Sequence, residues 1–302
     1  MTADLSLCGW RIHSDLPMPE VAHWQYDNRP RDVVISYAPS GDIELPSSVR
    51  QLSLLTHVCA TGGWYLQVPG IATICARDGA EVQIARRERA GAEDIKPFVL
   101  GPVLQAIVRQ RGLITLQATT VAYGDGAVAL CGATGVGKSA IGYALSRRGC
   151  MLISDGLTVV NLRPDRSHMS ASATFPAFYF WRAAVQSLDL PKAGVVASRA
   201  GLASHYYKVD AAAFDAMASV PLRHMVIVRR TGSTRQAVTI EDPAEAEPLV
   251  RRQILRGDPF PSEADTLALD ALTRRLASML KVHVVVATDD RETAILIESL
   301  LG

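Results

Sequence analysis

The sequence is poor in lysine and asparagine, and it lacks the motifs of several large nucleotide-using families. Lys occurs five times and Asn twice in 302 residues. Neither Asn28 nor Asn161 begins the N-K-x-D motif that reads guanine, so we expect no GTPase. L-S-G-G-Q, D-x-D, H-R-D and D-F-G are missing too. Their absence argues against a transporter ATPase, several small-metabolite kinases and a eukaryotic-type protein kinase.

Cysteine, basic clusters and long apolar runs are also scarce. The five Cys are scattered without a C-x-x-C, which argues against a disulfide framework or a zinc site and favours a reducing, cytoplasmic location. The net charge is +1 and Arg residues form only short pairs, so we expect no nucleic-acid partner. Met1–Asp4 lacks the pattern of a signal peptide. No apolar run reaches the ~18 residues of a membrane span, so we expect no membrane partner.

Residues 1–96 are expected to form a β-rich domain. The whole chain is 48% hydrophobic and 20% charged, which is typical of a protein that buries a core. Its length suffices for one large domain or two ordinary ones. Short apolar runs separated by Gly, Pro and Asp predict strands at Asp32–Tyr37, Trp64–Val68, Ile71–Ala76 and Val82–Ala85. No residues in this half have catalytic spacing, so we assign the domain no role.

Residues 97–302 are expected to form an α/β domain. Pro97–Arg111 carries apolar residues at helical spacing and ends before Gly112, a residue type that often follows a helix. Two apolar runs around Gly124–Gly126 predict a β-hairpin, over Leu113–Tyr123 and Ala127–Cys131. Further strands are expected at Cys150–Ser154, Leu222–Val228, Ala237–Ile240 and Val282–Ala287, and helices at Lys138–Arg148, Ala244–Leu255, Ser262–Leu280 and Asp290–Leu301. This alternation of strands and helices is typical of α/β proteins.

Acidic residues precede the last of these helices. Thr288-Asp289-Asp290 has the composition of a second metal site. Asp289 is also followed three residues later by Glu292, the spacing of a capping box. We therefore favour helix capping over metal binding at this position.

The most specific feature is a glycine-rich motif between an expected strand and an expected helix. Gly132–Ser139 reads G-A-T-G-V-G-K-S, which matches G-x-x-x-x-G-K-[ST]. Its glycines let backbone N–H groups face phosphate oxygens, and the helix that starts at Lys138 adds its positive N-terminal end. Lys138 would contact the β- and γ-phosphates as a catalytic residue, and the Ser139 hydroxyl would be a ligand of Mg²⁺. The expected nucleotide-binding residues are Gly132, Ala133, Thr134, Gly135, Val136, Gly137, Lys138, Ser139 and Ala140.

Asp155 is the second candidate for chemistry. It follows the expected strand Cys150–Ser154, and the carboxyl ends of strands in open α/β sheets face the ligand crevice. We expect this strand to lie beside the one that leads into the glycine-rich motif. A carboxylate there can bind Mg²⁺ or accept the proton of an acceptor hydroxyl. The alternative is a turn-forming role, because Asp-Gly is a common turn pair.

Five sequence segments, in the same order, carry a family resemblance. They are Gly9–Glu20, which is similar to G-x-x-I-x-S-x-L-P-L-P-E; Leu116–Cys131; Leu152–Gly156; Phe180-Trp181 with Leu188; and Tyr207–Asp210 followed by Pro221–Arg223. With the glycine-rich motif, they resemble the HPr kinase/phosphorylase superfamily. The sequence is most similar to the HPr-kinase-like serine kinases found with lasso-peptide biosynthesis genes. The resemblance extends along nearly the whole chain and implies an HPr-kinase-like P-loop fold for the second domain.

The resemblance implies an ATP-dependent serine kinase. Such a kinase transfers the γ-phosphate of ATP, with Mg²⁺, to a hydroxyl of a peptide or small protein, here the C-terminal Ser of a lasso-peptide precursor. Asp155 would be the general base or a metal-linked acid. Lys208 would be a further charged residue near the phosphates. A homo-oligomer is also implied, because HPr kinases assemble as hexamers.

Two positions depart from the family pattern. Gln117 stands where the family often has His, and a neutral Gln cannot tune a neighbouring base through its charge. Gly156 stands where the family has a second acid. The Gly- and Arg-rich C-terminal signature of true HPr kinase/phosphorylases is missing as well. Two alternatives therefore stay open: a kinase for HPr or a small molecule, and a catalytically impaired nucleotide-binding regulatory protein.

Overall fold

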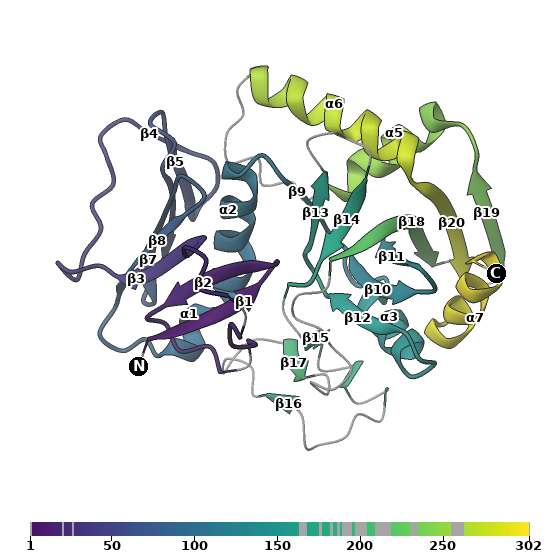
Figure 1. Cartoon of the computed structure of the whole chain (residues 1–302), viewed down its shortest axis with the longest axis horizontal. Helices are drawn as coiled ribbons and strands as arrows, with labels where there is room; N and C mark the ends of the chain where they lie inside the picture. The colour runs from purple at the N-terminus through teal and green to yellow at the C-terminus, as the bar shows by residue number, and fades with distance from the viewer. Residues whose placement is uncertain are drawn as a thin grey trace. The chain divides into compact units, whose positions relative to one another are not determined.

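The computed structural model divides into two compact units, each containing helices and strands (Figure 1). The first covers the described residues up to Ile114 and the second covers those from Thr115 onward. The structure describes residues 2–19, 21–25, 27–162, 168–174, 177–181, 184–185, 188, 195–196, 204–208, 219–230, 235–254 and 263–301. No helix within these ranges is both long and apolar enough to cross a lipid bilayer.

The first unit is built on a sheet of eight described strands, in the order β1-β2-β3-β8-β7-β6-β5-β4. All neighbours pair antiparallel except β2 with β3 and β3 with β8. The strands are β1 Ala3–Leu7, β2 Trp10–Ser14, β3 Val33–Tyr37, β4 Val49–Gln51, β5 Thr56–Cys59, β6 Trp64–Val68, β7 Ala72–Arg77 and β8 Glu81–Arg86. The expectation of a β-rich N-terminal region is therefore confirmed. The four expected strands correspond to β3, β6, β7 and β8, whereas the other four were not predicted.

The helical segment that follows begins earlier than expected and is not uniform. It consists of α1, Ala92–Phe98, a π-helical turn over Val99–Val103, and α2, Leu104–Gln110. The prolines at 97 and 102 lie inside this segment, and each lacks the N–H that a regular α-helix needs. The segment ends as expected before Gly112, whose φ is +70°. It belongs to the first unit, whereas the sequence placed it at the start of the second domain, with the boundary between residues 96 and 97.

The second unit contains a mixed sheet of nine described strands. Its main path is β12-β10-β11-β18-β14-β13-β9, and β20 pairs with β18 and β19. The strands are β9 Ile114–Leu116, β10 Thr119–Tyr123, β11 Gly126–Cys131, β12 Met151–Ser154, β13 Thr158–Leu162, β14 Met169–Ser172, β18 Ser219–Arg230, β19 Gln236–Ile240 and β20 Lys281–Ala287. A separate set of three described strands comprises β15 Ala177–Trp181, β16 Val195–Val196 and β17 Ser204–Lys208.

The expected hairpin is present as β10 and β11, which join at Tyr123 and Gly126. The strand expected over Leu113–Tyr123 is interrupted, because its first part forms β9 on another part of the sheet. Three parallel strands form the centre: β11 pairs with β18, and β18 pairs with β20. Their carboxyl ends therefore lie at one edge of the sheet, where ligands of α/β proteins commonly bind.

Two helices and a strand cover one face of this sheet. The described helices of the unit are α3 Lys138–Ser146, α5 Pro243–Gln253, α6 Glu263–Met279 and α7 Asp290–Leu301. Ile141 of α3, Ile297 of α7 and Phe178 of β15 pack with Leu130 of β11 and Val226 of β18 in one apolar cluster. All five side chains are essentially buried. This core fixes the starts of α3 and α7 beside the carboxyl end of β11.

Candidate functional site

The Gly132–Ser139 loop connects a fully buried strand to a helix. Every residue of β11 is buried, and α3 begins at Lys138. Gly132 has a φ of +136°, and a Cβ built on it would lie 2.6 Å from the carbonyl oxygen of Val228. Glycine is therefore required there both for backbone conformation and for space. The strand, loop and helix follow one another as the motif predicts.

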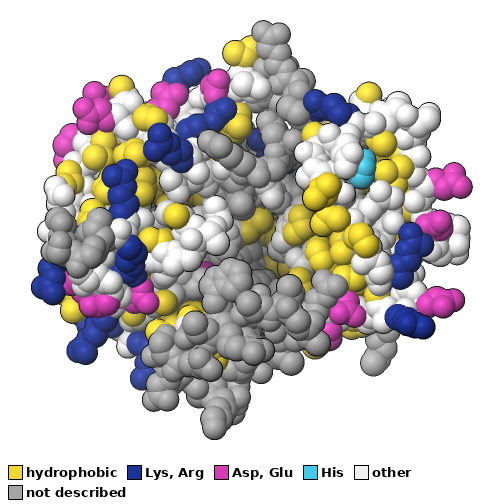
Figure 2. Space-filling view, turned by 180° about the vertical axis from the view of Figure 1, so that it is seen from behind, with side chains coloured by type: hydrophobic (Ala, Val, Ile, Leu, Met, Phe, Trp, Pro, Cys, Tyr) yellow, Lys and Arg dark blue, Asp and Glu magenta, His cyan; other side chains and the backbone are white. Residues whose placement is uncertain are grey.

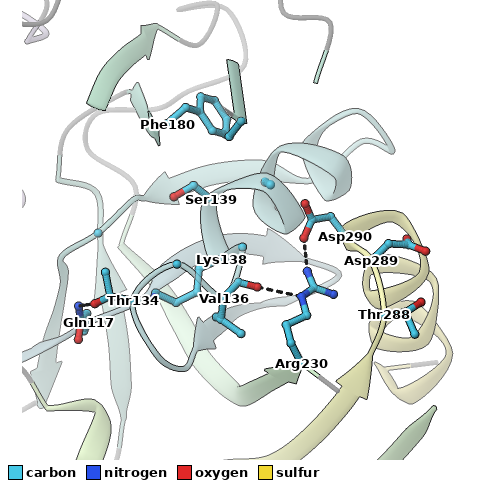
Figure 3. A pocket seen from close by; sticks show the side chains of 15 residues that line it. Gln117, Thr134, Val136, Lys138, Ser139, Phe180, Arg230, Thr288, Asp289 and Asp290 are labelled. Carbon is cyan, nitrogen blue, oxygen red and sulfur yellow. Dashed lines mark hydrogen bonds and ion pairs between the residues drawn. The ribbon is translucent and has the colours of Figure 1, made fainter. Parts of the chain in front are cut away.

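Lys138 points back into the loop (Figure 3). Its Nζ donates hydrogen bonds to the carbonyl oxygens of Gly132, at 3.0 Å, and Ala133, at 3.1 Å. Burial lowers the pKa of the Lys138 ammonium, and the nearby Cys131 and Asp155 oppose this shift. An anion placed in the loop would favour the charged form of Lys138 for the same reason that Asp155 does.

Asp155 reaches the loop by a route that the sequence did not predict. β12, which ends just before it, pairs with β10 and not with β11, so the expectation of adjacent strands was wrong. Asp155 nevertheless contacts the loop, because its Oδ1 accepts hydrogen bonds from Ser139 Oγ at 2.9 Å and Thr119 Oγ1 at 2.5 Å. Thr119 lies on the intervening β10. Asp155 is only 4% exposed, so the carboxylate is held firmly behind Ser139.

The residue after Asp155 forms the turn that the alternative reading predicted. Gly156 has a φ of +81°, and a Cβ built there would meet no atom within 4 Å. A second acid at this position would therefore have space, but its backbone would be strained. Asp155 thus both ends a strand before a turn and binds the hydroxyl of Ser139, so the two readings are compatible.

Two glutamines from distant parts of the chain hold the beginning of the loop. The N–H of Gly132 donates to Oε1 of Gln253, at 3.1 Å, at the end of α5. Gln117 Nε2 donates to Thr134 Oγ1 at 3.2 Å, as Figure 3 shows. Gln117 therefore anchors the loop by a neutral hydrogen bond. Gln253 carried no sequence signal that could have identified it.

Arg230, at the end of β18, holds the other end of the loop. Its Nε donates to the carbonyl oxygen of Val136 at 3.1 Å, and its Nη1 donates to Thr293 Oγ1 at 2.9 Å. Its Nη2 forms an ion pair with Asp290 (Figure 3). Burial raises the pKa of the Asp290 carboxyl, whereas Arg230 lowers it. Arg230 was not predicted as a site residue, because short Arg pairs occur at several places in the sequence and carry no motif.

The acidic residues before α7 form a helix cap, as predicted. Asp289 Oδ1 accepts the N–H of Glu292 at 2.8 Å. The Glu292 carboxylate accepts from the hydroxyl of Thr288 at 2.8 Å and from its N–H at 3.3 Å. The reciprocal bond of the capping box thus goes to Thr288 and not to the cap residue itself. Asp290 has the separate role of pairing with Arg230.

These residues surround a cavity of about 590 Å³, a size typical of small-molecule sites. Asp155 is not part of its lining, although its neighbour Gly156 is. Lys208 ends β17, but its side chain lies outside the described residues, as do Val209 and Asp210. The lining residues are Gln117, Thr134, Gly135, Val136, Gly137, Lys138, Ser139, Ala140, Gly156, Phe180, Ala184, Arg230, Thr288, Asp289 and Asp290.

The described residues offer a divalent cation few ligands. Among the described residues, no group of three or more His, Cys, Asp and Glu side chains is arranged to hold a metal ion. Ser139 and Asp155 supply hard oxygen donors 2.9 Å apart. This set fits Mg²⁺, which commonly binds one or two protein carboxylates and completes its shell with water and substrate phosphates.

Charged side chains of both signs are mixed on the face drawn in Figure 2. On the face drawn in Figure 2, the described Lys and Arg side chains are interspersed with Asp and Glu. The described part of this face therefore has no extended basic area. The expected lack of a nucleic-acid partner stays a prediction.

Comparisons with known proteins find similar chains among solved structures. No protein-family model matches the sequence, and no curated protein matches it. Among solved structures, the chain is similar to the Hpr(Ser) kinase/phosphatase from Coxiella burnetii, with a TM-score of 0.31 and 12% identity. The similarity covers 62% of this chain and 93% of that one. A structural similarity of this size carries no functional argument.

Proposed function

We propose that the protein is an HPr-kinase-like phosphotransferase that binds ATP with Mg²⁺ and transfers the γ-phosphate to a hydroxyl group. The observation that carries this proposal is the contact between Ser139 and Asp155, 2.9 Å apart, beside a loop of the Gly-Lys-Ser type. A loop that bound nothing would not need a buried carboxylate against its serine. The adjacent cavity is large enough for a nucleotide.

The loop supplies the groups that a triphosphate requires. The amides at the start of α3 present N–H donors and the positive end of the helix dipole. Lys138 leaves its carbonyl partners in the loop and turns its ammonium group toward the phosphates. Ser139 and Asp155 would hold the cation, which would supply charge neutralisation of the phosphate oxygens.

Transfer depends mainly on positioning and charge. In-line transfer requires little covalent chemistry from the protein, so holding the nucleotide and the acceptor in place contributes most of the rate. Asp155 is the residue assigned to the proton of the acceptor hydroxyl or to the cation. Its burial behind Ser139 supports the cation-holding role more directly than the role of base.

The acceptor is proposed from the sequence resemblance. By that resemblance it is a serine hydroxyl of a peptide or small protein, and specifically the C-terminal Ser of a lasso-peptide precursor. HPr and a small molecule are the alternatives. The second unit binds the nucleotide, and no part of the acceptor site is assigned to the first unit.

One observation favours a second function, that of a nucleotide-binding regulatory protein without transfer activity. Asp155 does not line the cavity, and the second acid of the family pattern is replaced by Gly156. A protein that uses ATP only as a signal would bind it without needing an accessible base.

The test is mass spectrometry after incubation with ATP and Mg²⁺. One sample contains a lasso-precursor peptide ending in Ser, the other contains HPr, and the matched control is Lys138→Ala. Phosphate on the peptide with the wild type alone supports the tailoring kinase, and phosphate on HPr alone shifts the acceptor to that protein. If neither acceptor is modified while ATP still binds, the kinase proposal fails for these acceptors and the regulatory function is favoured.

A further inference from the structure

The ion pair of Arg230 and Asp290 lies directly against the Gly132–Ser139 loop. Arg230 donates to the carbonyl oxygen of Val136. A Cβ built on the next residue, Gly137, would overlap Asp290 Oδ1 and would lie 2.9 Å from Arg230 Nη2. Gly137 therefore lacks a side chain at the point where the pair meets the loop. Gly137 also has a φ of +99°, which favours glycine at this position for a second reason, independent of the contact.

The pair connects the loop to the first turn of α7 through a chain of hydrogen bonds. Arg230 Nη1 donates to Thr293 Oγ1 at 2.9 Å. The Thr293 hydroxyl in turn donates to the carbonyl oxygen of Asp289 at 2.5 Å. Thr293 is completely buried, so its side chain cannot exchange these partners for water. The carbonyl of Val136 is thereby tied to the residue that caps α7.

The geometry requires arginine and not merely a positive charge. Three guanidinium nitrogens of Arg230 donate to three acceptors: a backbone carbonyl, a hydroxyl and a carboxylate. A planar guanidinium holds such donors in fixed directions, whereas the ammonium of lysine is a single flexible point charge. Both charged side chains are partly buried, so removing either one leaves the other without its partner in a site of restricted solvation.

We propose that Arg230 is a positioning residue, which fixes the loop to the start of α7 and so sets the direction of the amides that receive phosphate. Asp290 holds the guanidinium in place from the α7 side. This inference rests on the proposed function for its effect on nucleotide affinity, but its effect on the loop is independent of any ligand. If the ion pair had only a general stabilising role, its loss would lower global stability without acting on the loop selectively.

The first measurement is hydrogen–deuterium exchange of the free protein over residues 133–140. The amide of Val136 is bonded to the Ala133 carbonyl at 3.2 Å and is the most direct reporter. We compare the wild type with Arg230→Ala, Arg230→Lys and Asp290→Asn. Arg229→Ala is the matched control, because Arg229 is adjacent and exposed. Relative to the wild type, all three test variants should accelerate exchange over the loop more than over β11, and the control should match the wild type.

The second measurement is the Kd for ATP with Mg²⁺ by isothermal titration calorimetry. Arg230→Ala should weaken binding about ten- to a hundredfold, the effect of losing hydrogen bonds from a charged group. Arg230→Lys should not restore binding, because lysine cannot make the three contacts together. If Arg230→Ala does not fold, the lysine and Asp290→Asn variants carry the same test.

Two results would overturn the inference. One is wild-type loop exchange in Arg230→Lys and Asp290→Asn, and the other is equal acceleration over β11 and the loop. A wild-type protein that does not bind ATP would instead refute the proposed function. In that case, a selective acceleration of loop exchange in the Arg230 variants would still support the positioning role. Failure of the proposed function and failure of this inference are therefore distinguishable.

Discussion

The two sides of the Gly132–Ser139 loop are built from different kinds of contact. On one side, Ser139 bonds Asp155, a residue 16 positions away in the chain. On the other, Val136 bonds Arg230, 94 positions away, and Arg230 pairs with Asp290 a further 60 positions along. The Asp155 side is closely buried and holds the groups proposed for chemistry, whereas the Arg230 side supports the loop from distant elements. Groups for chemistry can thus lie within one local motif, while those that hold its shape depend on the complete fold.

The largest expected difference between the two sides is in the rate of transfer. Asp155→Asn should still bind ATP, although at a higher Mg²⁺ concentration because a proposed cation ligand is weakened, while phosphate transfer falls about 10²–10⁴-fold through loss of the same carboxylate. Lys138→Ala should abolish transfer. Arg230→Ala should instead act mainly on KM for ATP. Steady-state kinetics with the acceptor identified by mass spectrometry measures both quantities, and an Asp155→Asn protein with normal turnover would refute the role of Asp155.

The next effect tests whether space on the Arg230 side is needed. Gly137→Ala should weaken ATP binding more than Gly135→Ala, because a Cβ at residue 137 must displace the ends of the Asp290 and Arg230 side chains, in addition to a backbone strain of about 1–2 kcal/mol that both variants share. Gly135 has a φ of +83° but no atom within 4 Å of a Cβ built there, so it is a matched control. Calorimetric titration of both variants measures the difference. Equal losses would contradict a specific contact between Gly137 and the ion pair.

A smaller effect is expected from restoring an acid on the Asp155 side. Gly156→Asp places a carboxylate at the cavity, where there is open space, and should lower the Mg²⁺ concentration needed for ATP binding a few-fold. It should also lower the free energy of unfolding by about 1 kcal/mol, because the φ of +81° is unfavourable for a side chain. Gly156→Asn shares the strain without the charge. If both variants respond identically to Mg²⁺, the added charge has no role.

The smallest expected effect lies elsewhere on β18, away from both sides of the loop. His224 stacks on His283 with 3.1 Å between their ring nitrogens, and burial, with His283 and Lys281 nearby, lowers the pKa of His224 to about 4. Between pH 6.5 and 4 the unfolded chain therefore binds a proton that the folded protein does not, so the free energy of unfolding falls as the pH falls. His224→Gln should reduce this slope in urea unfolding without changing ATP affinity at pH 7.

Local features of the second unit could be predicted from the sequence. The hairpin before the loop, the start of α3 and the cap at Asp289 depend on residues a few positions apart, and all three are present.

In the first unit, the helix expected from Pro97 was wrong in its start and regularity, because prolines altered its hydrogen bonding. Periodicity alone does not report that change.

Long-range features could not be read from the chain. β10 lies between β11 and β12 in the sheet. This order depends on β10, the hairpin partner of β11, pairing with β11 at the position where β12 was expected. Arg230 and Gln253 gain their roles only when β18 and α5 are placed beside the loop. An Arg at the end of a strand and a Gln at the end of a helix are common, so neither residue type indicates a loop anchor.

The contact of Arg230 with Asp290 also sets a time order during protein synthesis. The loop residues are made first, and Asp290 follows about 150 residues later, which at about 5–20 residues per second is on the order of 10 s of translation. Throughout that interval α7 has not been synthesised, so Asp290 cannot yet hold Arg230 against the loop. The ribosome must therefore finish β20 and the start of α7 before the loop acquires the conformation described here.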